Sequence, residues 1–424
     1  MLEINKIRQN PEDIIARLEI KNFVNAAQSI ESIIKNDEEK RRIQKEKEDL
    51  KAKQNAKAKE IGQLIKDGNN EEAEKAKNEV SRIKELEKEY EKKLILLEET
   101  INEILISLPN TPDNSVPRGK TAQDNITIHQ EGEIPSLSQD AIPHWELCQK
   151  YDIIDFELGN KITGSGFPVY KGKGARLQRG LVNFFLDNAV ENGYIEVEPP
   201  LIVNSSSAMA TGQLPDKEGQ MYHIPLDGFY LIPTAEVPLT NIFRDTIVQE
   251  KDMPIKRCAF SQCFRREAGS YGKDVRGLNR LHQFDKVEIV CIDTQEHSYK
   301  QLEAMKDYVG NILRKLELPF RILKLCGGDM SFTSALTFDF ETFSAAQQRW
   351  LEVSSVSNFE TFQSNRLKLR YKNSENKTTL AHTLNGSALA LPRIVASLLE
   401  NNQTSQGIKI PKALIPYTGF DIIN

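Results

Sequence analysis

The residues best suited to chemistry lie in a short run that reads FRRE at positions 264–267. Arg265 and Glu267 are two apart and follow an apolar, strand-like stretch, so we expect both side chains on one face of a strand. The planar guanidinium of arginine suits a carboxylate or a phosphate, and a glutamate accepts hydrogen bonds from amines. Phe284, on the next strand-like stretch, offers a ring on which a base can stack. Such a strand pair can hold an adenylate, although an Arg-x-Glu pair on its own is more often a surface ion pair.

Other short stretches decide between these two interpretations. They read GYIEVEPPLI at 193–202, TGQLP at 211–215, TAE at 234–236, FRREAGS at 264–270, GLNRLHQFDKVE at 277–288, EVSS at 352–355 and NGSALALPR at 385–393. In this order and spacing they resemble the motifs of class II aminoacyl-tRNA synthetases, in the form found in seryl-tRNA synthetases. The first stretch is similar to the motif that forms the dimer seam, which implies a homodimer. The resemblance runs nearly from one end of the chain to the other.

The resemblance implies a ligase that joins L-serine to tRNA(Ser) through a seryl-adenylate, at the expense of ATP. Whether selenocysteine tRNA is also charged stays open. Because the serine carboxylate is itself the nucleophile in the first step, positioning and neutralisation of charge matter more than proton transfer. We therefore expect structural roles, and not general-base roles, for His282 and His382.

The same resemblance assigns two catalytic arginines. Arg265 is expected to bridge the serine carboxylate and the α-phosphate, and Arg393, at the start of a helix, to hold the γ-phosphate. Glu267 is expected to orient the adenine amino group and Phe284 to stack on the adenine ring. The residues expected at ATP are Arg265, Arg266, Glu267, Phe284, Glu352, Val353, Ser354, Ser355 and Arg393, of which Glu352 and Ser355 are the expected oxygen ligands of Mg²⁺.

Serine recognition needs polar groups. Thr234 and Glu236 are expected to meet the ammonium, while Glu288 and Ser387 read the hydroxyl and the ammonium between them; how these four divide the contacts stays open. Buried groups that pair with a hydroxyl reject alanine, which would leave them unsatisfied. The full set of expected serine contacts is Thr234, Ala235, Glu236, Arg265, Glu288, Asn385 and Ser387. No role can be assigned to Asp216, where the family often has a lysine, or to the polar loop at 371–379.

The first hundred residues have a different pattern. Residues 28–66 and 71–107 are rich in strong helix formers, with a turn at 67–70 between them. Apolar residues recur every three or four positions in the second run and more sparsely in the first, which predicts an antiparallel coiled coil with a diluted seam. Each helix would be on the order of 50 Å long. Residues 40–59 include nine basic and only three acidic residues. This excess of positive charge is typical of a solvated helix face or of a phosphate-binding stripe.

A linker with three prolines, at 108–117, separates this region from the rest. We predict an N-terminal domain at 1–110, with a helical-hairpin arm at about 28–106 that resembles the tRNA-binding arm of the family. The domain at 111–424 should have the α+β class II fold, an antiparallel sheet flanked by helices. Within it we expect helices at 177–191, 237–250, 298–316 and 394–401, and strands at 194–197, 229–232, 259–264, 285–292, 321–325, 337–342 and 350–355.

Composition sets further bounds. The chain has 424 residues and a net charge of −5, and it lacks an apolar run long enough to span a membrane and an N-terminal export signal, so we expect a cytoplasmic protein. Its five cysteines are scattered, which favours buried thiols over a zinc site at Cys258 and Cys263.

Two alternative functions remain in view. An amino acid:carrier-protein ligase on the same catalytic fold would be expected to lack the long basic arm. A coiled-coil adaptor with a degenerate enzyme domain would have lost at least one of Arg265, Glu267, Glu352 and Arg393, and all four are present.

Overall fold

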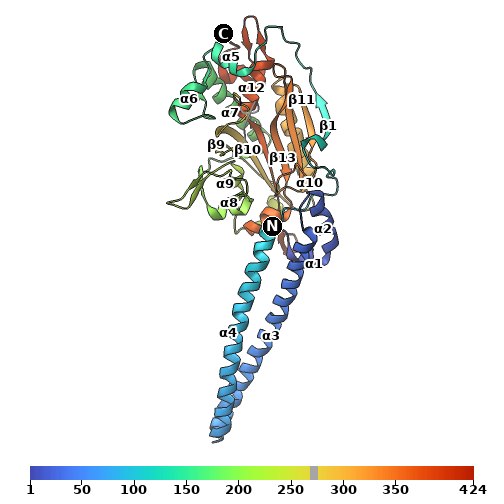
Figure 1. Cartoon of the computed structure of the whole chain (residues 1–424), viewed down its shortest axis with the longest axis vertical. Helices are drawn as coiled ribbons and strands as arrows, with labels where there is room; N and C mark the ends of the chain where they lie inside the picture. Colours follow the sequence, from blue (N-terminus) through green and yellow to red (C-terminus); the bar gives the residue numbers. More distant parts are fainter. Residues whose placement is uncertain (268–275) are drawn as a thin grey trace. The chain divides into compact units, whose positions relative to one another are not determined.

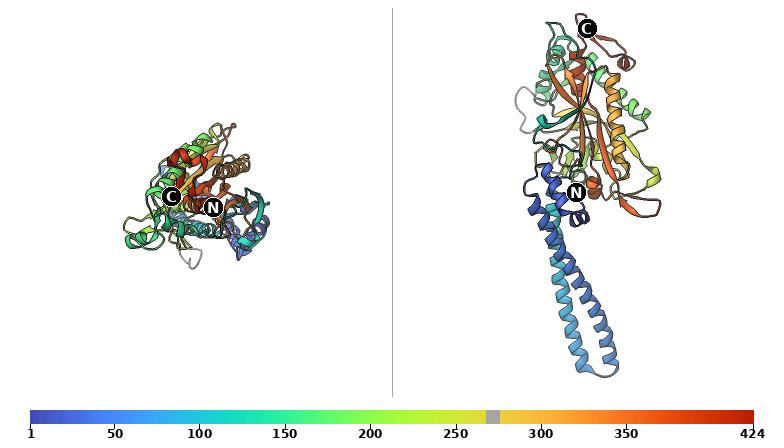
Figure 2. Two further views of the ribbon diagram at one scale, coloured as in Figure 1. Left: turned by 90° about the horizontal axis from the view of Figure 1, so that it is seen from above. Right: turned by 90° about the vertical axis from the view of Figure 1, so that its right-hand side faces the viewer.

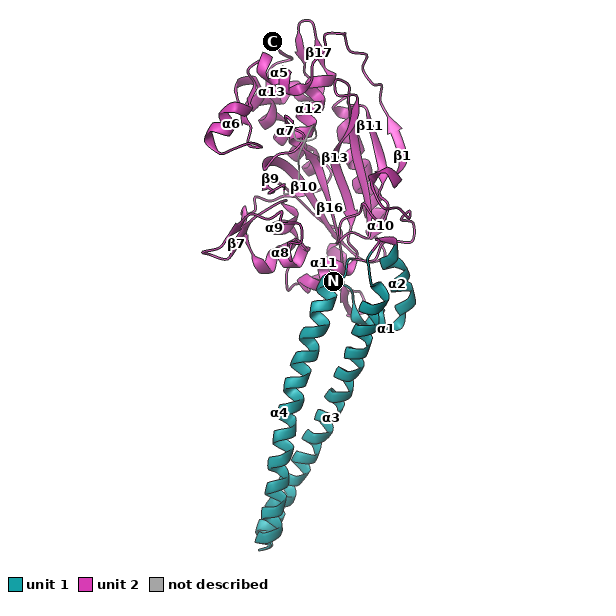
Figure 3. Ribbon diagram, in the orientation of Figure 1, with its two compact units in different colours: residues 1–19, 23–109 teal, residues 20–22, 110–424 magenta. Residues whose placement is uncertain are grey.

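The structure, a computed structural model, describes residues 1–267 and 276–424. Contacts among these residues divide the chain into two compact units (Figure 3). The first comprises residues 1–19 and 23–109, and the second comprises residues 20–22 and 110–424.

The first unit is built on two long helices, α3 (Ala26–Lys66) and α4 (Asn70–Ser107), which pack antiparallel as predicted (Figures 1 and 2). Two short helices, α1 (Ile4–Gln9) and α2 (Pro11–Ile20), precede them. Few apolar side chains along the two long helices are buried: Ala26, Ile30, Ile33, Ile43, Ala73, Ala76, Ile83, Ile101 and Leu105. The seam is therefore thin over much of its length, as the sequence predicts.

Ion pairs between the two helices mark their register. Lys40 lies 3.5 Å from Glu98, Lys47 lies 3.6 Å from Glu91, and Lys57 lies 3.1 Å from Glu79. Exposed pairs of this kind contribute at most about 1 kcal/mol each. They align the two helices more than they stabilise them.

The second unit contains an eight-stranded sheet in the order β1 (Ile126–Glu131), β11 (Phe320–Lys324), β12 (Leu336–Ser344), β13 (Arg349–Asn358), β16 (His382–Ala390), β10 (Gln283–Asp293), β9 (Ile255–Phe264) and β4 (Ile195–Glu196). Every neighbouring pair is antiparallel except β4 and β9. Helices α7 (Gly172–Glu191), α10 (Ser298–Lys315) and α12 (Leu391–Asn401) pack on the sheet (Figure 1). The predicted antiparallel sheet flanked by helices is confirmed.

Apolar side chains from the sheet and these helices form one main core, with Phe185, Phe320 and Phe340 almost fully buried. The remaining helices of four or more residues are α5 (His144–Lys150), α6 (Phe156–Ile162), α8 (Ser205–Thr211), α9 (Glu236–Asn241), α11 (Thr361–Leu367) and α13 (Ile415–Thr418). The smaller sheets combine β2 (Ile154–Asp155) with β3 (Val169–Tyr170); β5 (Ile202–Asn204), β7 (Phe229–Leu231) and β6 (His223–Ile224); β15 (Thr378–Leu380), β14 (Arg370–Lys372) and β8 (Ile247–Gln249); and β17 (Gln403–Thr404), β18 (Gly407–Lys409) and β19 (Ile422–Ile423).

Two predictions for this unit are wrong. The helix expected at 237–250 is only the short α9, because Asp245 adopts a positive φ of 57° and the chain then enters β8. The expected loop at 371–379 is instead a hairpin of β14 and β15, and β14 also pairs with β8. The other predicted helices and strands each overlap an observed one. None of the helices in the described part of the chain is both long and apolar enough to cross a membrane.

Candidate active site

Two polar cavities adjoin one another over strands β10, β13 and β16, with volumes of about 320 and 710 Å³. The antiparallel register sets Glu288 on β10 opposite Ser387 on β16. On β10, Phe284, Lys286 and Glu288 alternate with apolar or outward residues and therefore share a face. The side chains that line both cavities are Arg265, Glu267, Arg280, Lys286, Glu352, Ser355 and Ser387.

Arg265 lies where the two cavities meet. Its guanidinium stacks on the ring of Phe284, 5.2 Å from the centroid, and its Nε donates to the carbonyl of Pro233 over 3.3 Å. The expectation that Arg265 and Glu267 share the face of a strand is wrong, because β9 ends at Phe264 and Glu267 has a positive φ of 49°. This turn directs the Glu267 carboxylate into an ion pair with Arg280.

Arg266 takes a different direction. Its backbone N–H donates to the carbonyl of Gln220 over 2.9 Å, and its guanidinium lies over the ring of Tyr222 at 5.7 Å. Residues 268–270 of the same predicted motif lie outside the described residues.

Arg393 lies in the first turn of α12, as expected. Its Nη1 donates to the backbone carbonyl of Glu352 over 2.7 Å and lies 3.4 Å from the Glu352 carboxylate. Its Nε donates to the carbonyl of Asn279 over 3.1 Å. The smaller cavity therefore has an arginine at each of two walls, Arg265 and Arg393, an arrangement that suits a chain of phosphates.

The larger cavity reaches a set of buried charges. Glu288 is fully buried, and its carboxylate accepts hydrogen bonds from Thr234 Oγ1 (2.9 Å) and Asn385 Nδ2 (3.0 Å). Lys286 forms an ion pair with Glu288 and donates to Thr234 Oγ1 over 2.9 Å. Asn385 Nδ2 also donates to Glu236 over 2.9 Å, so one amide links both carboxylates.

Glu236 is the less compensated of the two acids. Gln363 donates to its Oε1 over 2.6 Å, but no ion pair neutralises it among the residues the structure describes. Burial, and then repulsion from Glu288, raise the pKa of Glu236 from 4.5 to about 7. The neighbouring Ala235, also expected at serine, is fully buried against Leu239 and Val290 and does not line the cavity.

The segment predicted to hold a metal lies within β13. Glu352 is half exposed, and Ser355 lies opposite Asp339 in the register of β12 and β13. Asp339 Oδ1 is buried and has no hydrogen-bond partner among the described residues. Burial and the nearby charge of Glu352 raise the pKa of Asp339 well above its ordinary value. Val353 is buried in the core, and Ser354 Oγ donates to the carbonyl of Ser387 over 2.5 Å.

The two histidines considered from the sequence are engaged elsewhere. His282 Nδ1 lies 3.1 Å from both the Tyr222 hydroxyl and the Arg265 carbonyl, and His382 Nδ1 lies 2.7 Å from Ser298 Oγ. Asp216 accepts from the backbone N–H groups of Gln220 and Met221, so it closes a turn.

Sequence reasoning assigned no role to Lys286, Gln363 or Asp339. For Lys286 a signal was present, because its spacing of two from Glu288 sets both side chains on one face of a strand. Gln363 reaches Glu236 from 127 residues away in the chain, and no local pattern marks such a contact.

Comparison with known proteins bears directly on this site. The family described as "tRNA synthetase class II core domain (G, H, P, S and T)" matches residues 222–402, and the "Seryl-tRNA synthetase N-terminal domain" matches residues 1–112. A serine–tRNA ligase of Salinibacter ruber is 49% identical over 99% of this chain and 98% of its own length. One from Leptospira biflexa is 47% identical over 98% of this chain and 100% of its own length.

This chain belongs to the seryl-tRNA synthetase family.

A solved structure agrees with this assignment. The seryl-tRNA synthetase of Pyrococcus horikoshii, complexed with ATP, superimposes with a TM-score of 0.93 at 33% identity and covers 100% of this chain and 99% of its own. The prediction of a class II serine–tRNA ligase is therefore confirmed. The roles of individual residues in this synthetase stay predictions.

The raised pKa of Glu236 predicts how serine binding depends on pH. Above pH 7 the carboxylate is ionised and, in the role expected for it from the sequence, attracts the serine ammonium; as the pH falls below about 7 it takes up a proton and this attraction is lost. The KM for serine in ATP–pyrophosphate exchange should therefore rise as the pH falls from 8 to 6, by up to about tenfold per pH unit.

Glu236→Gln is the matched control, since it keeps the hydrogen bond from Asn385 but cannot ionise. It should bind serine weakly at every pH and flatten the profile. A profile of unchanged steepness in this variant would show that another group titrates.

Proposed function

We propose that this seryl-tRNA synthetase activates serine in the larger cavity and binds ATP in the smaller one, with Arg265 between them. One observation carries the proposal: Glu236 lines the larger cavity, the fully buried Glu288 lies beside it, and the two carboxylates share one amide donor, Asn385. Burying two like charges is costly unless a cation joins them. The ammonium of serine is such a cation.

In this arrangement the serine ammonium lies nearest Glu236, the acid without an ion pair in the described structure. Glu288 and Ser387, opposite one another on β10 and β16, are then left for the hydroxyl. Alanine would leave these groups unpaired, and the additional methyl of threonine must be excluded by close packing. The position of Arg265 between the cavities supports a contact with the serine carboxylate.

The smaller cavity takes the nucleotide. Arg265 there neutralises the charge that builds up on the α-phosphate as the carboxylate attacks, while Arg393 holds the γ-phosphate and Glu267 the adenine amino group. Arg265 now covers the ring of Phe284, so adenine must share or replace that stacking partner. The relative from P. horikoshii, whose structure is complexed with ATP, supports nucleotide binding here.

The side-chain oxygens near the proposed phosphate positions suit Mg²⁺ as ligands. Glu352 and Ser355 supply oxygens, and the buried Oδ1 of Asp339, which has no hydrogen-bond partner among residues 1–267 and 276–424, adjoins them. Mg²⁺ prefers oxygen ligands and supplies neutralisation of phosphate charge when bound.

Glu352→Gln should raise the Mg²⁺ concentration needed for half-maximal exchange, because it removes a charged oxygen ligand. An unchanged Mg²⁺ requirement would show that Glu352 is not a ligand.

Replacing Arg265 by lysine tests the phosphate contact. Lysine keeps the charge but loses the planar fork, so single-turnover formation of seryl-adenylate should slow by more than about tenfold, or about 1.4 kcal/mol in the barrier. Arg257→Lys, on the same strand, is the matched control and should react at the parental rate. Parental adenylate formation by Arg265→Lys would contradict a direct role for Arg265.

We also propose that the arm of α3 and α4 holds tRNA(Ser). Nine basic residues between Lys40 and Lys59 can displace counterions from the tRNA backbone, and the arm lies outside the cavities described above. The arm also distinguishes this enzyme from a carrier-protein ligase, which would have no use for it.

Shortening the arm separates activation from transfer. The ion pair of Lys47 and Glu91 marks a level at which the helices can be rejoined, so removing residues 48–90 and closing the gap with a short glycine-rich turn keeps the base of the arm. Serine-dependent exchange should stay near the parental rate, and charging of tRNA(Ser) should fall by orders of magnitude. Charging by the intact enzyme should weaken steeply with salt, whereas exchange should not.

Two outcomes would contradict this role. Parental charging by the shortened enzyme would mean that the arm does not bind tRNA, and a parallel loss of exchange would mean that the arm supports the catalytic unit instead.

A homodimer is the proposed assembly. The edge strand β4 exposes Ile195, and a groove of about 690 Å³ between α7 and residues 196–199 is lined by Val182, Leu186 and Val197. A second copy would cover this apolar edge. Sedimentation velocity should find dimers of the parent enzyme and weaker dimers of Ile195→Glu, because the variant places a charge in the proposed interface. Only monomers in both would contradict the homodimer.

Two finer proposals complete the function. Because the arm can contact phosphates without reading bases, we include selenocysteine tRNA as a second substrate, to be tested by charging a purified transcript.

The five cysteines, all free and buried, suit a reducing cytoplasm, where fractionation should find the enzyme.

A further inference from the structure

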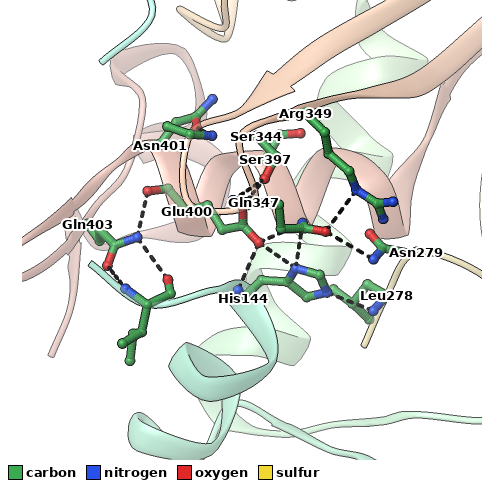
Figure 4. A network of polar contacts seen from close by, with 12 residues as sticks. His144, Leu278, Asn279, Ser344, Gln347, Arg349, Ser397, Glu400, Asn401 and Gln403 are labelled. Carbon is green, nitrogen blue, oxygen red and sulfur yellow. Dashed lines mark hydrogen bonds and ion pairs between the residues drawn. The ribbon is translucent and has the colours of Figure 1, made fainter. Parts of the chain in front are cut away.

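The segment that leads into β10, residues 276–281, is held from one side by the first residue of α5. Figure 4 shows this residue, His144, within a buried network that joins the segment to the end of α12. His144 and Glu400 are both fully buried, and their side chains lie 2.6 Å apart. Neither residue lines either of the cavities assigned to serine and ATP.

The hydrogen bonds define which nitrogen of His144 carries the proton. The backbone N–H of Leu278 donates to Nε2 over 2.8 Å, so Nε2 is an acceptor and Nδ1–H donates to Glu400. Glu400 also accepts from the backbone N–H of His144 (2.9 Å), from Gln347 (2.9 Å) and from Ser344. Burial acts to raise the pKa of Glu400, but the hydrogen bonds from His144 and Ser344 outweigh it and hold this pKa below its ordinary value.

Gly277 makes the contact with His144 possible. It has a positive φ of 69°, and a Cβ added to it would lie 2.2 Å from His144 Nε2. Any other residue would therefore push the imidazole away from the N–H of Leu278. Arg276, the residue before, lies over the ring of Trp145 at 4.8 Å, so two successive residues of α5 hold the segment at Leu278 and at Arg276.

The residue after Leu278 connects this contact to the nucleotide end of the site. The carbonyl of Asn279 accepts from Arg393 Nε over 3.1 Å, and the Asn279 amide donates to Gln347 over 3.2 Å. Arg393 and Glu400 belong to the two ends of one helix, α12. His144 therefore contacts the segment that holds Arg393 Nε, through Leu278, and the helix that carries Arg393, through Glu400. Glu352 holds Nη1 of the same guanidinium from β13.

We propose that His144 is a positioning residue for ATP binding, which acts by holding the Asn279 carbonyl against Arg393 so that the arginine fork is fixed in the direction of the phosphates. The inference rests on the role proposed above for Arg393 at the γ-phosphate. It assigns no contact between His144 and any substrate. Substitution of a residue that only stabilised the core would change the KM for serine and the KM for ATP alike.

Two substitutions of His144 separate its two hydrogen bonds. Asparagine presents an amide near the position of Nδ1, so His144→Asn keeps a donor for Glu400 and loses the acceptor for Leu278. Glutamine reaches the position of Nε2, so His144→Gln keeps that acceptor. In serine-dependent exchange, His144→Asn should raise the KM for ATP about tenfold, the effect of one lost buried hydrogen bond, with the KM for serine within about twofold of the parent. His144→Gln should restore the KM for ATP to within about threefold of the parent.

Ser344→Ala is the matched control, because it removes another hydrogen bond to Glu400 without touching residues 276–281. It should lower the melting temperature and leave both KM values unchanged. Gly277→Ala breaks the same contact from the other side and leaves His144 and Glu400 intact, so it should reproduce the selective rise in the KM for ATP even if His144→Asn does not fold.

The outcomes are distinct. A parental KM for ATP in His144→Asn or in Gly277→Ala would overturn the proposal, as would an equal rise in both KM values. Absence of serine-dependent exchange in the parent enzyme would instead overturn the proposed site as a whole.

Discussion

The burial of two neighbouring carboxylates, one of which lines the larger cavity, is the constraint on which the rest of the site depends. Glu236 and Glu288 are both withdrawn from water, and a carboxylate in such a place is costly unless donors and cations surround it. Lys286, Thr234 and Asn385 meet this need for Glu288, while Glu236 receives hydrogen bonds from the amides of Gln363 and Asn385 and has no ion pair with any described residue. The cavity thus suits one further cation, and we propose that this cation is the ammonium of serine.

The architecture follows from the need to bring these groups together. Glu288 and Asn385 come from neighbouring strands, β10 and β16, whereas Glu236 comes from the first turn of α9. The register of the antiparallel sheet fixes the positions of Glu288 and Asn385. The two hydrogen bonds from Asn385, one to each acid, then fix helix α9 relative to the sheet. At the nucleotide end, α12 plays the equivalent part, since Arg393 at its start and Glu400 near its end are each tied to the chain around residue 278.

Much of this could be predicted from the sequence because the informative residues occur in short local patterns. The spacing of Lys286 and Glu288, the proline that opens α12 beside Arg393, and the long helical runs of the arm are all local signals. The path of the chain at Glu267 was not predictable, because a positive φ in a non-glycine residue leaves no mark on an apolar pattern.

Contacts between distant residues were also beyond prediction. His144 and Glu400 are 256 positions apart, and His144 carries no motif that would distinguish it from an ordinary buried histidine. The positioning role that we propose for His144 depends on the fold, which brings α5, α12 and residues 276–281 together (Figure 4).

The central claim is that the paired carboxylates select serine. ATP–pyrophosphate exchange measured with each of the twenty amino acids in turn tests it most directly. The account predicts strong exchange with serine alone, with alanine and threonine each lower by at least about two orders of magnitude in kcat/KM. Exchange with alanine or threonine at a rate close to that with serine, or none with serine, would contradict it.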